Sequence, residues 1–555
     1  MSWRLGRRLR PVGPHPGAGR PAPDEVLVDL PRLVSDYYSL QPDPEQLEHR
    51  VQFGTSGHRG SAQDHRFNQA HLRAIVQAVC DVRAKNSISG PMFVGKDTHA
   101  LSEPAWRTAI EVLIGNGVPV LTADTYIPTP LVSRALLTHN ARHAAPADGL
   151  IITPSHNPPR DGGIKYNPPH GGPSESSFSV AIEARANELL AAPPTGVPFE
   201  RAWRAVELFD FVQPYVDALP SVVRLDWIRD TGLKLGADPL GGSAITVWDR
   251  VAEAHGLNLE ITNPRVDGTF RFMTLDGDGQ IRMDCSSPHA MASLVQLKDR
   301  FQVSFGNDAD ADRHGIVTPG RGLFNPNHFL AILVDHLFAT RDAWPASMGA
   351  GQTVVTSALV RRAAEARGRA VIEVPVGFKW FVPLLVEGKA GFAGEESAGA
   401  TVATLDGRPW TTDKDGLVLA LLAAEIAAHQ ERDLDEVHRG LTEKLGAPAY
   451  RRVDAPANRA QKKVLKELGP EDVVADALAG DPIVRCLTRA PGNDEAIGGL
   501  KVETERGWFA ARPSGTEDVY KIYGESFEGD QHLDRILEEA KTIVDETFRR
   551  AGVQS

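Results

Sequence analysis

Three successive stretches of the chain alternate between helix-like and strand-like hydrophobic patterns, and this alternation is the strongest constraint on its fold. In the first stretch, apolar residues recur at helical spacing over residues 72–82, and a short apolar run follows at residues 92–94. Similar stretches cover residues 206–316 and 322–438. This pattern is typical of α/β layers, in which helices cover a sheet. Because 555 residues exceed what one hydrophobic core normally serves, we expect several domains.

The C-terminal part of the chain follows a different pattern. Trp508 and Tyr520 lie in two strand-like segments that flank a turn, and apolar residues recur at helical spacing from Leu533 to Phe548. We predict domain boundaries near residues 205, 320 and 445. The predicted plan is a partly disordered N-terminal extension at 1–39, followed by domains at 40–205, 206–320, 321–445 and 446–555.

Composition argues against several functional classes. The formal net charge of -12 disfavours a nucleic-acid partner, because binding to a phosphate backbone needs concentrated lysine and arginine. A small phosphorylated ligand is still compatible, since it needs only a few converging cations. The three widely spaced cysteines fit a reducing compartment, so we expect a cytoplasmic protein. No apolar run reaches the ~18 residues of a membrane span, and residues 1–23 lack the apolar core of a secretory signal.

The segment GLIITPSHN places a serine directly after a strand-like run. Residues 150–153 are typical of a buried strand, and a proline ends it, so Ser155 lies on a loop at the carboxyl edge, where α/β sheets bind ligands. His156 can exchange protons near neutral pH, and Lys165 offers charge neutralisation or general-base help. A proline-bracketed turn with no catalytic role fits these local residues at least as well.

Three aspartates alternate with alanines in the segment SFGNDADADR. In an extended stretch, Asp308, Asp310 and Asp312 point to one face, where their carboxylates repel unless a cation lies between them. Hard carboxylate oxygens with open positions for phosphate or water suit Mg²⁺. The alternative is a solvated acidic loop, which the strand-like run just before the trio disfavours. Arg313, beside the trio, suggests an anion nearby.

Three further segments carry polar groups that suit a phosphorylated sugar. In GEESAG, Glu395 and Ser397 can hydrogen-bond sugar hydroxyls, although the same spacing suits a helix start. In VGFKW, Lys379 can contact a phosphate or a ring hydroxyl, or lie on the surface. FGTSGHRG is a glycine-flexible loop that brings in Arg59.

The segment RPSGT combines one guanidinium, two hydroxyls, a glycine and free backbone N–H groups. Arg512, Ser514, Gly515 and Thr516 therefore form a compact candidate phosphate cradle, although similar turns occur without a ligand. The segment GPMFVGKD has the spacing of a nucleotide-binding P-loop, but Asp97 stands where that motif requires serine or threonine. We therefore assign it no phosphate-binding role.

Together and in this order, the segments TPSHNP, DADADRHG, GEESAG and RPSGTE make the chain resemble the α-D-phosphohexomutases, and within them the bacterial glucose-specific phosphoglucomutases, from about residue 40 to the C-terminus. The resemblance implies an α/β protein with four domains around a central cleft. Three related mixed-sheet α/β domains are expected, followed by a smaller α+β C-terminal domain. Each domain would contribute one loop to the cleft.

The resemblance also implies roles for individual residues. Ser155 would carry the phosphate and complete a metal site with Asp308, Asp310 and Asp312. Sugar recognition would fall to Glu395 and Ser397, and binding of the distal phosphate to Arg512, Ser514, Gly515 and Thr516. Positions that the family places in the cleft match Arg59, His156, Lys165, Arg313 and Lys379. Ala309 and Ala311 stand where many relatives have glycine, so we expect altered loop geometry with intact ligation.

The implied reaction is the reversible interconversion of α-D-glucose 1-phosphate and glucose 6-phosphate through a phosphoserine enzyme. One Mg²⁺ per chain would assist, and glucose 1,6-bisphosphate would be the intermediate and activator. Three alternatives stay open: a phosphomannomutase or phosphoglucosamine mutase of the same family, a metal-dependent sugar phosphatase, and a catalytically silent sugar-phosphate binder. We expect a monomer or homodimer that binds a phosphosugar, and neither nucleic acid nor membrane.

Overall fold

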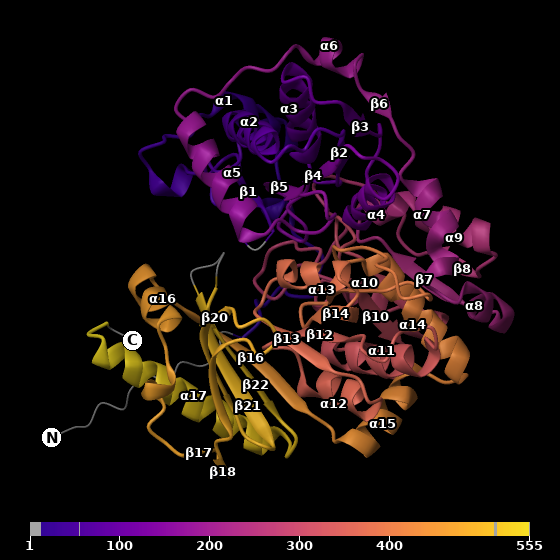
Figure 1. The fold of residues 1–555 in the computed structure, drawn as a ribbon, viewed down its shortest axis with the longest axis vertical. Coiled ribbons are helices and arrows are strands. Elements are labelled where there is room, and N and C mark those ends of the chain that lie inside the picture. Colours follow the sequence, from indigo (N-terminus) through magenta and orange to yellow (C-terminus); the bar gives the residue numbers. More distant parts are fainter. Residues whose placement is uncertain (1–12, 55, 515–518, 554–555) are drawn as a thin grey trace.

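The computed structural model describes residues 13–54, 56–514 and 519–553. Three mixed β-sheets follow one another along the chain, and an antiparallel sheet lies near the C-terminus (Figure 1). Helices pack on each of the first three sheets, whereas the fourth packs mainly against a long C-terminal helix. We call the units built on these sheets domains 1 to 4. This architecture confirms the predicted α/β class with three related domains and a different C-terminal domain.

Domain 1 is built on a six-stranded sheet in the order β1-β5-β4-β2-β3-β6, in which only β5 runs antiparallel to its neighbours. Its central strands are buried along their whole length because helices cover the sheet, which explains their uninterrupted apolar runs. The strands are β1 His58–Ser61, β2 Met92–Lys96, β3 Val120–Thr122, β4 Asp148–Ile152, β5 Asp161–Asn167 and β6 Glu207–Leu208. The helices are α1 Leu30–Ser39, α2 Gln69–Lys85, α3 Ser102–Gly115, α4 Thr129–Asn140, α5 Ser176–Leu189 and α6 Phe199–Trp203.

Domain 2 is built on a five-stranded sheet in the order β11-β10-β9-β7-β8, and here β10 is the strand antiparallel to its neighbours. A long segment, mostly without regular structure, connects β8 to α10. The strands are β7 Leu235–Asp238, β8 Leu259–Ile261, β9 Val303–Gly306, β10 Gly315–Thr318 and β11 Gly322–Leu323. The helices are α7 Val212–Ala218, α8 Leu225–Thr231, α9 Trp248–His255 and α10 Ala292–Val295.

Domain 3 is built on a four-stranded sheet in the order β13-β12-β14-β15, with β15 antiparallel to β14. Its helix α14 is buried on all sides, and the single acidic residue of that helix, Glu425, is paired with His336 at 2.8 Å and Arg341 at 2.7 Å. The strands are β12 Gly349–Thr353, β13 Val371–Val374, β14 Ala390–Glu395 and β15 Gly399–Val402. The helices are α11 Pro326–Thr340, α12 Ala358–Ala366, α13 Val382–Val386, α14 Gly416–Gln430 and α15 Leu434–Leu445.

Domain 4 is an antiparallel sheet in the order β16-β22-β21-β20-β19, packed against α17 and α16. It lies beside domain 3, where the Glu525 carboxylate accepts the N–H of Ala358 at the start of α12 at 2.8 Å. The strands are β16 Ala449–Pro456, β17 Ala477–Leu478, β18 Asp481–Pro482, β19 Arg485–Arg489, β20 Ala496–Glu503, β21 Gly507–Pro513 and β22 Val519–Ser526. The helices are α16 Arg459–Lys466 and α17 Asp530–Arg550.

The segment before domain 1 has defined contacts from residue 13 onward. Main-chain hydrogen bonds join Gly19 and Arg20 to Leu275 in the irregular segment of domain 2. Further along, α1 buries Leu33 and Tyr37 in the core of domain 1. The described part of the predicted extension therefore connects domains 1 and 2.

None of the helices in the described ranges combines the length and apolar character needed to cross a bilayer.

Candidate active site

The candidate site lies on three loops that occupy the same place in domains 1, 2 and 3. Each loop connects a parallel strand of its sheet to the antiparallel strand that follows, namely β4 to β5, β9 to β10 and β14 to β15. Each contains one non-glycine residue with a left-handed backbone: Ser155 at φ 58°, Ala311 at φ 56° and Ala398 at φ 68°. Such conformations cost free energy and persist where surrounding contacts hold them, which is typical of functional loops.

The Ser155 loop meets the aspartate loop directly. Ser155 is 1% exposed, and its Oγ donates to Asp308 Oδ2 at 2.8 Å across the boundary between domains 1 and 2. The second carboxylate oxygen of Asp308 accepts the Arg313 N–H at 3.1 Å, which closes the aspartate loop on itself. Two residues 153 positions apart in sequence are thereby brought into contact.

The three aspartates form a group that could hold a metal ion. All three are buried, and one carboxylate oxygen from each lies within 4.8 Å of the others. Asp310 Oδ1 and Asp312 Oδ1 are buried without a hydrogen-bond partner, so both are available as ligands. Burial, followed by repulsion from Asp310 and Asp312, raises the pKa of Asp308 well above its ordinary value. Hard oxygen donors with uncompensated charge fit a divalent cation such as Mg²⁺.

Several cations surround these carboxylates. Lys165 Nζ donates to Asp310 Oδ2 at 2.6 Å and to Asp312 Oδ2 at 2.9 Å, and Lys414 Nζ lies 3.1 Å from Asp312 Oδ2. Burial alone would raise the pKa of Asp312, but Lys165, Lys414 and Arg313 hold it well below its ordinary value. This concentration of positive charge suits a phosphate dianion.

The remaining predicted residues of domain 1 lie at the same place. His156 Nδ1 is 3.3 Å from Ser155 Oγ, and burial and the charge of Arg313 lower the pKa of His156 well below its ordinary value. The Arg59 guanidinium donates to the Asn157 side chain at 3.3 Å, and its charge interacts with those of the three aspartates. The structure therefore brings Ser155, His156, Lys165 and Arg59 together.

The GEES segment of domain 3 borders the aspartate loop. Arg313 Nη1 donates to the Ser397 carbonyl oxygen at 3.3 Å. The Glu395 carboxylate accepts the Gly377 N–H at 3.0 Å, and burial raises the pKa of Glu395. Lys379 Nζ instead donates to Ser176 Oγ of domain 1 at 2.8 Å, so it links domains 1 and 3.

The phosphate cradle predicted in domain 4 is only partly described. Arg512 lies at the end of β21. Burial and the charge of Glu396, in the GEES segment, raise the pKa of Tyr523, and the charge of Arg512 opposes this shift. Ser514 follows β21, and its N–H donates to Val519 at 2.9 Å. Gly515 and Thr516 lie outside the described residues. Among described residues, no hydrogen bond or ion pair joins Arg512 to Ser155 or to the aspartates.

Two residues of the site were missed by sequence reasoning. Lys414 precedes α14 and reaches the aspartate loop from domain 3. Thr129, the first residue of α4, donates its hydroxyl to Asp310 Oδ2 at 2.5 Å and its N–H to the Asp310 carbonyl at 2.9 Å. The charged TTDKDG segment, which precedes an apolar helix, could have marked Lys414 as a candidate site residue. Threonine is common at the start of a helix, so the sequence gave no comparable signal for Thr129.

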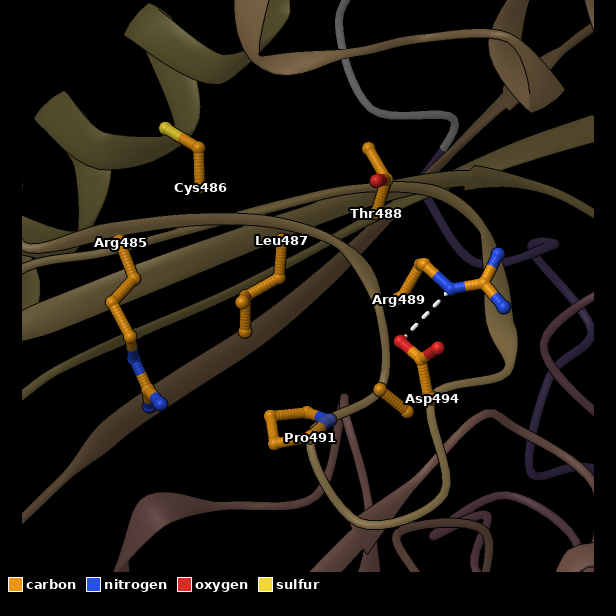
Figure 2. Close-up of a pocket in the computed structure, with 8 residues that line it drawn as sticks. Arg485, Cys486, Leu487, Thr488, Arg489, Pro491 and Asp494 are labelled. Atoms are coloured by element: carbon orange, nitrogen blue, oxygen red, sulfur yellow. Dashed lines mark hydrogen bonds and ion pairs between the residues drawn. The ribbon is translucent and has the colours of Figure 1, made fainter.

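A surface pocket of about 410 Å³ lies elsewhere, along the edge strand β19 of domain 4 (Figure 2). Its arginines are already paired, Arg485 with Glu503 at 2.7 Å and Arg489 with Asp494 at 2.9 Å. It contains none of the predicted site residues, so we do not connect it with the chemistry of Ser155.

Comparison with known families covers all four domains of the chain. Residues 50–192, 213–322 and 325–445 match the phosphoglucomutase/phosphomannomutase alpha/beta/alpha domains I, II and III, and residues 454–543 match the C-terminal domain of the same family. The phosphoglucomutase of Komagataeibacter xylinus is 51% identical over 545 residues, which cover 97% of this chain and 98% of that protein. The chain belongs to the phosphoglucomutase/phosphomannomutase family.

Other members of the phosphoglucomutase/phosphomannomutase family are more distant. The phosphoglucosamine mutase of Thermodesulfovibrio yellowstonii is 25% identical over 501 residues, covering 89% of this chain and 98% of that protein. Parafusin, a phosphoglucomutase from Paramecium in its open form, has a TM-score of 0.71 at 19% identity, covering 92% and 96% of the two chains. A family protein from Burkholderia thailandensis has a TM-score of 0.69 at 22% identity, covering 90% and 98%. These two structures show a shared fold.

Proposed function

We propose that this protein interconverts α-D-glucose 1-phosphate and glucose 6-phosphate through phosphorylated Ser155. The observation that carries the proposal is the 2.8 Å hydrogen bond from Ser155 Oγ to Asp308, because it joins the reactive serine of one domain to the carboxylate trio of another. The 51% identity to the Komagataeibacter xylinus phosphoglucomutase supports glucose as the sugar.

The reaction has two phosphoryl transfers. In the first, the bond between phosphorus and Ser155 Oγ breaks while a bond forms from phosphorus to O6 of glucose 1-phosphate. The O6 proton passes to His156 and then to the serine oxygen. Burial opposes the charge of Lys165, but Asp310 and Asp312 outweigh it and raise the pKa of Lys165, so this residue stays a cation. Glucose 1,6-bisphosphate then turns in the site, and a bond forms from Ser155 Oγ to the phosphorus on O1 while the O1–P bond breaks. The Ser155 hydroxyl proton passes through His156 to O1. Glucose 6-phosphate leaves, and the enzyme is phosphorylated as at the start.

Some residues of the site offset negative charge, and others bind and position the substrate. Lys165, Arg313 and Lys414 offset the negative charge that a phosphoryl group adds to a carboxylate-rich site. We assign sugar hydroxyls to Glu395 and Ser397, with Lys379 and Arg59 bordering the ligand, and the distal phosphate to Arg512, Ser514, Gly515 and Thr516. Asp308, Asp310 and Asp312, together with the phosphate on Ser155, would hold one Mg²⁺, which neutralises charge on the phosphoryl oxygens when bound.

A coupled assay with glucose 1-phosphate, Mg²⁺ and catalytic glucose 1,6-bisphosphate tests the proposal on the wild type and on Ser155→Ala. We expect turnover in the wild type and its loss in the variant, and undiminished activity of the variant contradicts the mechanism. Comparing the 1-phosphates of glucose, mannose and glucosamine tests the sugar, since equal or greater turnover of mannose 1-phosphate overturns the choice of glucose. Release of inorganic phosphate at the rate of sugar turnover identifies a phosphatase instead.

We also propose the cellular setting and assembly. The three cysteines are unpaired in the structure, which supports a reducing compartment and therefore the cytoplasm. We propose a monomer or homodimer that uses glucose 1,6-bisphosphate as activator, and four domains with boundaries near residues 205, 320 and 445.

A further inference from the structure

A second hydrogen-bond network holds the Ser155 loop from within domain 1. Its centre is Asp97, which directly follows β2. One carboxylate oxygen accepts from the N–H of His99 at 3.0 Å and from Ser102 Oγ at 2.5 Å. The other accepts from His99 Nδ1 at 2.8 Å and from Thr153 Oγ1 at 2.6 Å. All four residues are at most 2% exposed, so water competes little for these bonds.

The available donors and acceptors fix the direction of each bond. Thr153 gives its hydroxyl proton to Asp97, so the same oxygen is free to accept the Ser155 N–H at 2.8 Å. Both ring nitrogens of His99 face acceptors, the Asp97 carboxylate and the Asn157 carbonyl oxygen at 3.0 Å, so both carry protons. Burial opposes this charged form, but the Asp97 carboxylate outweighs it and raises the pKa of His99.

The network therefore holds the main chain on both sides of the reactive serine. Through Thr153 it holds the N–H of Ser155, and through His99 it holds the carbonyl of Asn157. Between these two points, Ser155 has φ 58°, a conformation that costs a non-glycine residue free energy. In this conformation its Oγ lies 2.8 Å from Asp308.

We infer that Asp97, His99 and Thr153 are positioning residues for phosphoryl transfer, which hold Ser155 in its left-handed conformation with Oγ directed at the aspartate trio. None of them need touch the sugar. Their removal should slow transfer while substrate binding stays the same, because the other phosphate and sugar contacts lie on different loops. This inference rests on the proposed transfer through Ser155.

The test compares matched substitutions of the two residues whose hydroxyls donate to Asp97, Thr153 and Ser102. Thr153→Val keeps the β-branched shape but removes the hydroxyl that joins Asp97 to the Ser155 N–H. Ser102→Ala removes another buried hydroxyl bound to Asp97, but one with no hydrogen bond to the Ser155 loop. Thr153→Ser restores the hydroxyl, and His99→Gln tests the second point of attachment. For each, kcat and KM for glucose 1-phosphate are measured, together with the thermal unfolding midpoint and the rate at which glucose 1,6-bisphosphate phosphorylates the protein.

We expect Thr153→Val and His99→Gln to lower kcat and the phosphorylation rate by about 10- to 100-fold, the usual range for residues that orient a reacting group, with KM within about twofold. Thr153→Ser and Ser102→Ala should stay within about threefold of the wild type. The inference is overturned if Thr153→Val keeps wild-type kcat or if Ser102→Ala lowers it equally. Should Thr153→Val fail to fold, wild-type kcat in His99→Gln overturns it. An inactive wild type, by contrast, refutes the proposed function itself.

Discussion

Gly242 provides a steric test of how closely domain 2 fixes the aspartate loop. It lies after β7, and its neighbour Ser243 donates its N–H to the Ala309 carbonyl at 2.8 Å. A Cβ on Gly242 would lie 2.6 Å from Ala309 Cα and 2.8 Å from the carbonyl oxygens of Ala309 and Asp308. The φ of Gly242 is -89°, which any residue can adopt, so Gly242→Ala tests contact alone.

The size of the effect follows from these distances. Ordinary contact begins at 3.4 Å, so the Ala309 backbone must move by about 0.8 Å to accept the methyl group. Because these contacts are to backbone atoms, no side chain can turn away to relieve them. A displacement of about 1 Å in a catalytic group can cost about 100-fold in rate, equivalent to about 2.7 kcal/mol in the barrier. We also expect overpacking to destabilise the fold by about 1–3 kcal/mol.

The assay measures kcat for glucose 1-phosphate over a range of Mg²⁺ concentrations. We expect Gly242→Ala to lower kcat by about 100-fold and to raise the Mg²⁺ concentration required. Gly440→Ala is the matched control, because its added Cβ has no heavy atom within 4 Å beyond its chain neighbours and the backbone of its own helix. A folded Gly242→Ala protein with wild-type kcat and an unchanged Mg²⁺ requirement would refute the reasoning.

Three further predictions concern stability. Burial lowers the pKa of His71 from 6.5 to about 3, so its contribution to the free energy of unfolding is complete above pH 6.5 and falls by about 3 kcal/mol at pH 4.5. Urea unfolding at pH 7.5 and 4.5 should therefore show a smaller loss of stability at acid pH in His71→Gln than in the wild type, and an equal loss contradicts this. Arg83→Met strands the buried Asp148 carboxylate, now 2.7 Å from Arg83 Nε, and should cost about 3–5 kcal/mol in unfolding free energy; an unchanged denaturation midpoint argues against it. Glu525→Ala leaves Ser357 and other buried donors without an acceptor where domains 3 and 4 meet, which should weaken the contact between these domains. Limited proteolysis should then release domain 4 faster than in the wild type, and equal cleavage rates count against a role of Glu525 in holding the two domains together.

The general fold and the centre of the site could be predicted from sequence because their signals are local. Buried parallel strands have continuous apolar runs, and the motifs that follow β4, β9 and β14 mark loops at the carboxyl edge of each sheet. The resemblance then supplied the order and number of the domains, which the four family matches confirm. The apolar run around Leu417 forms α14, a buried core helix whose Glu425 is paired with Arg341.

Contacts between domains could not be predicted in this way. Lys414 and Thr129 contact the aspartates only because domains 3 and 1 pack on domain 2, and no local spacing encodes that packing. Asp97 was set aside as a failed P-loop position, yet the structure places it beneath the Ser155 loop. Thr153, which joins Asp97 to this loop, lies 56 positions along the chain, so the hydrogen bond between them became visible only in the folded chain.

Ser155 itself allows the most direct test of the central claim, that its phosphoryl group moves to the sugar. Protein labelled by radioactive glucose 1,6-bisphosphate is freed of sugar and mixed with excess unlabelled glucose 1-phosphate for a single turnover. The account predicts that label leaves the Ser155 peptide at a rate no slower than kcat and appears in glucose 1,6-bisphosphate or glucose 6-phosphate. Label that stays on the protein, or that appears as inorganic phosphate, would contradict it.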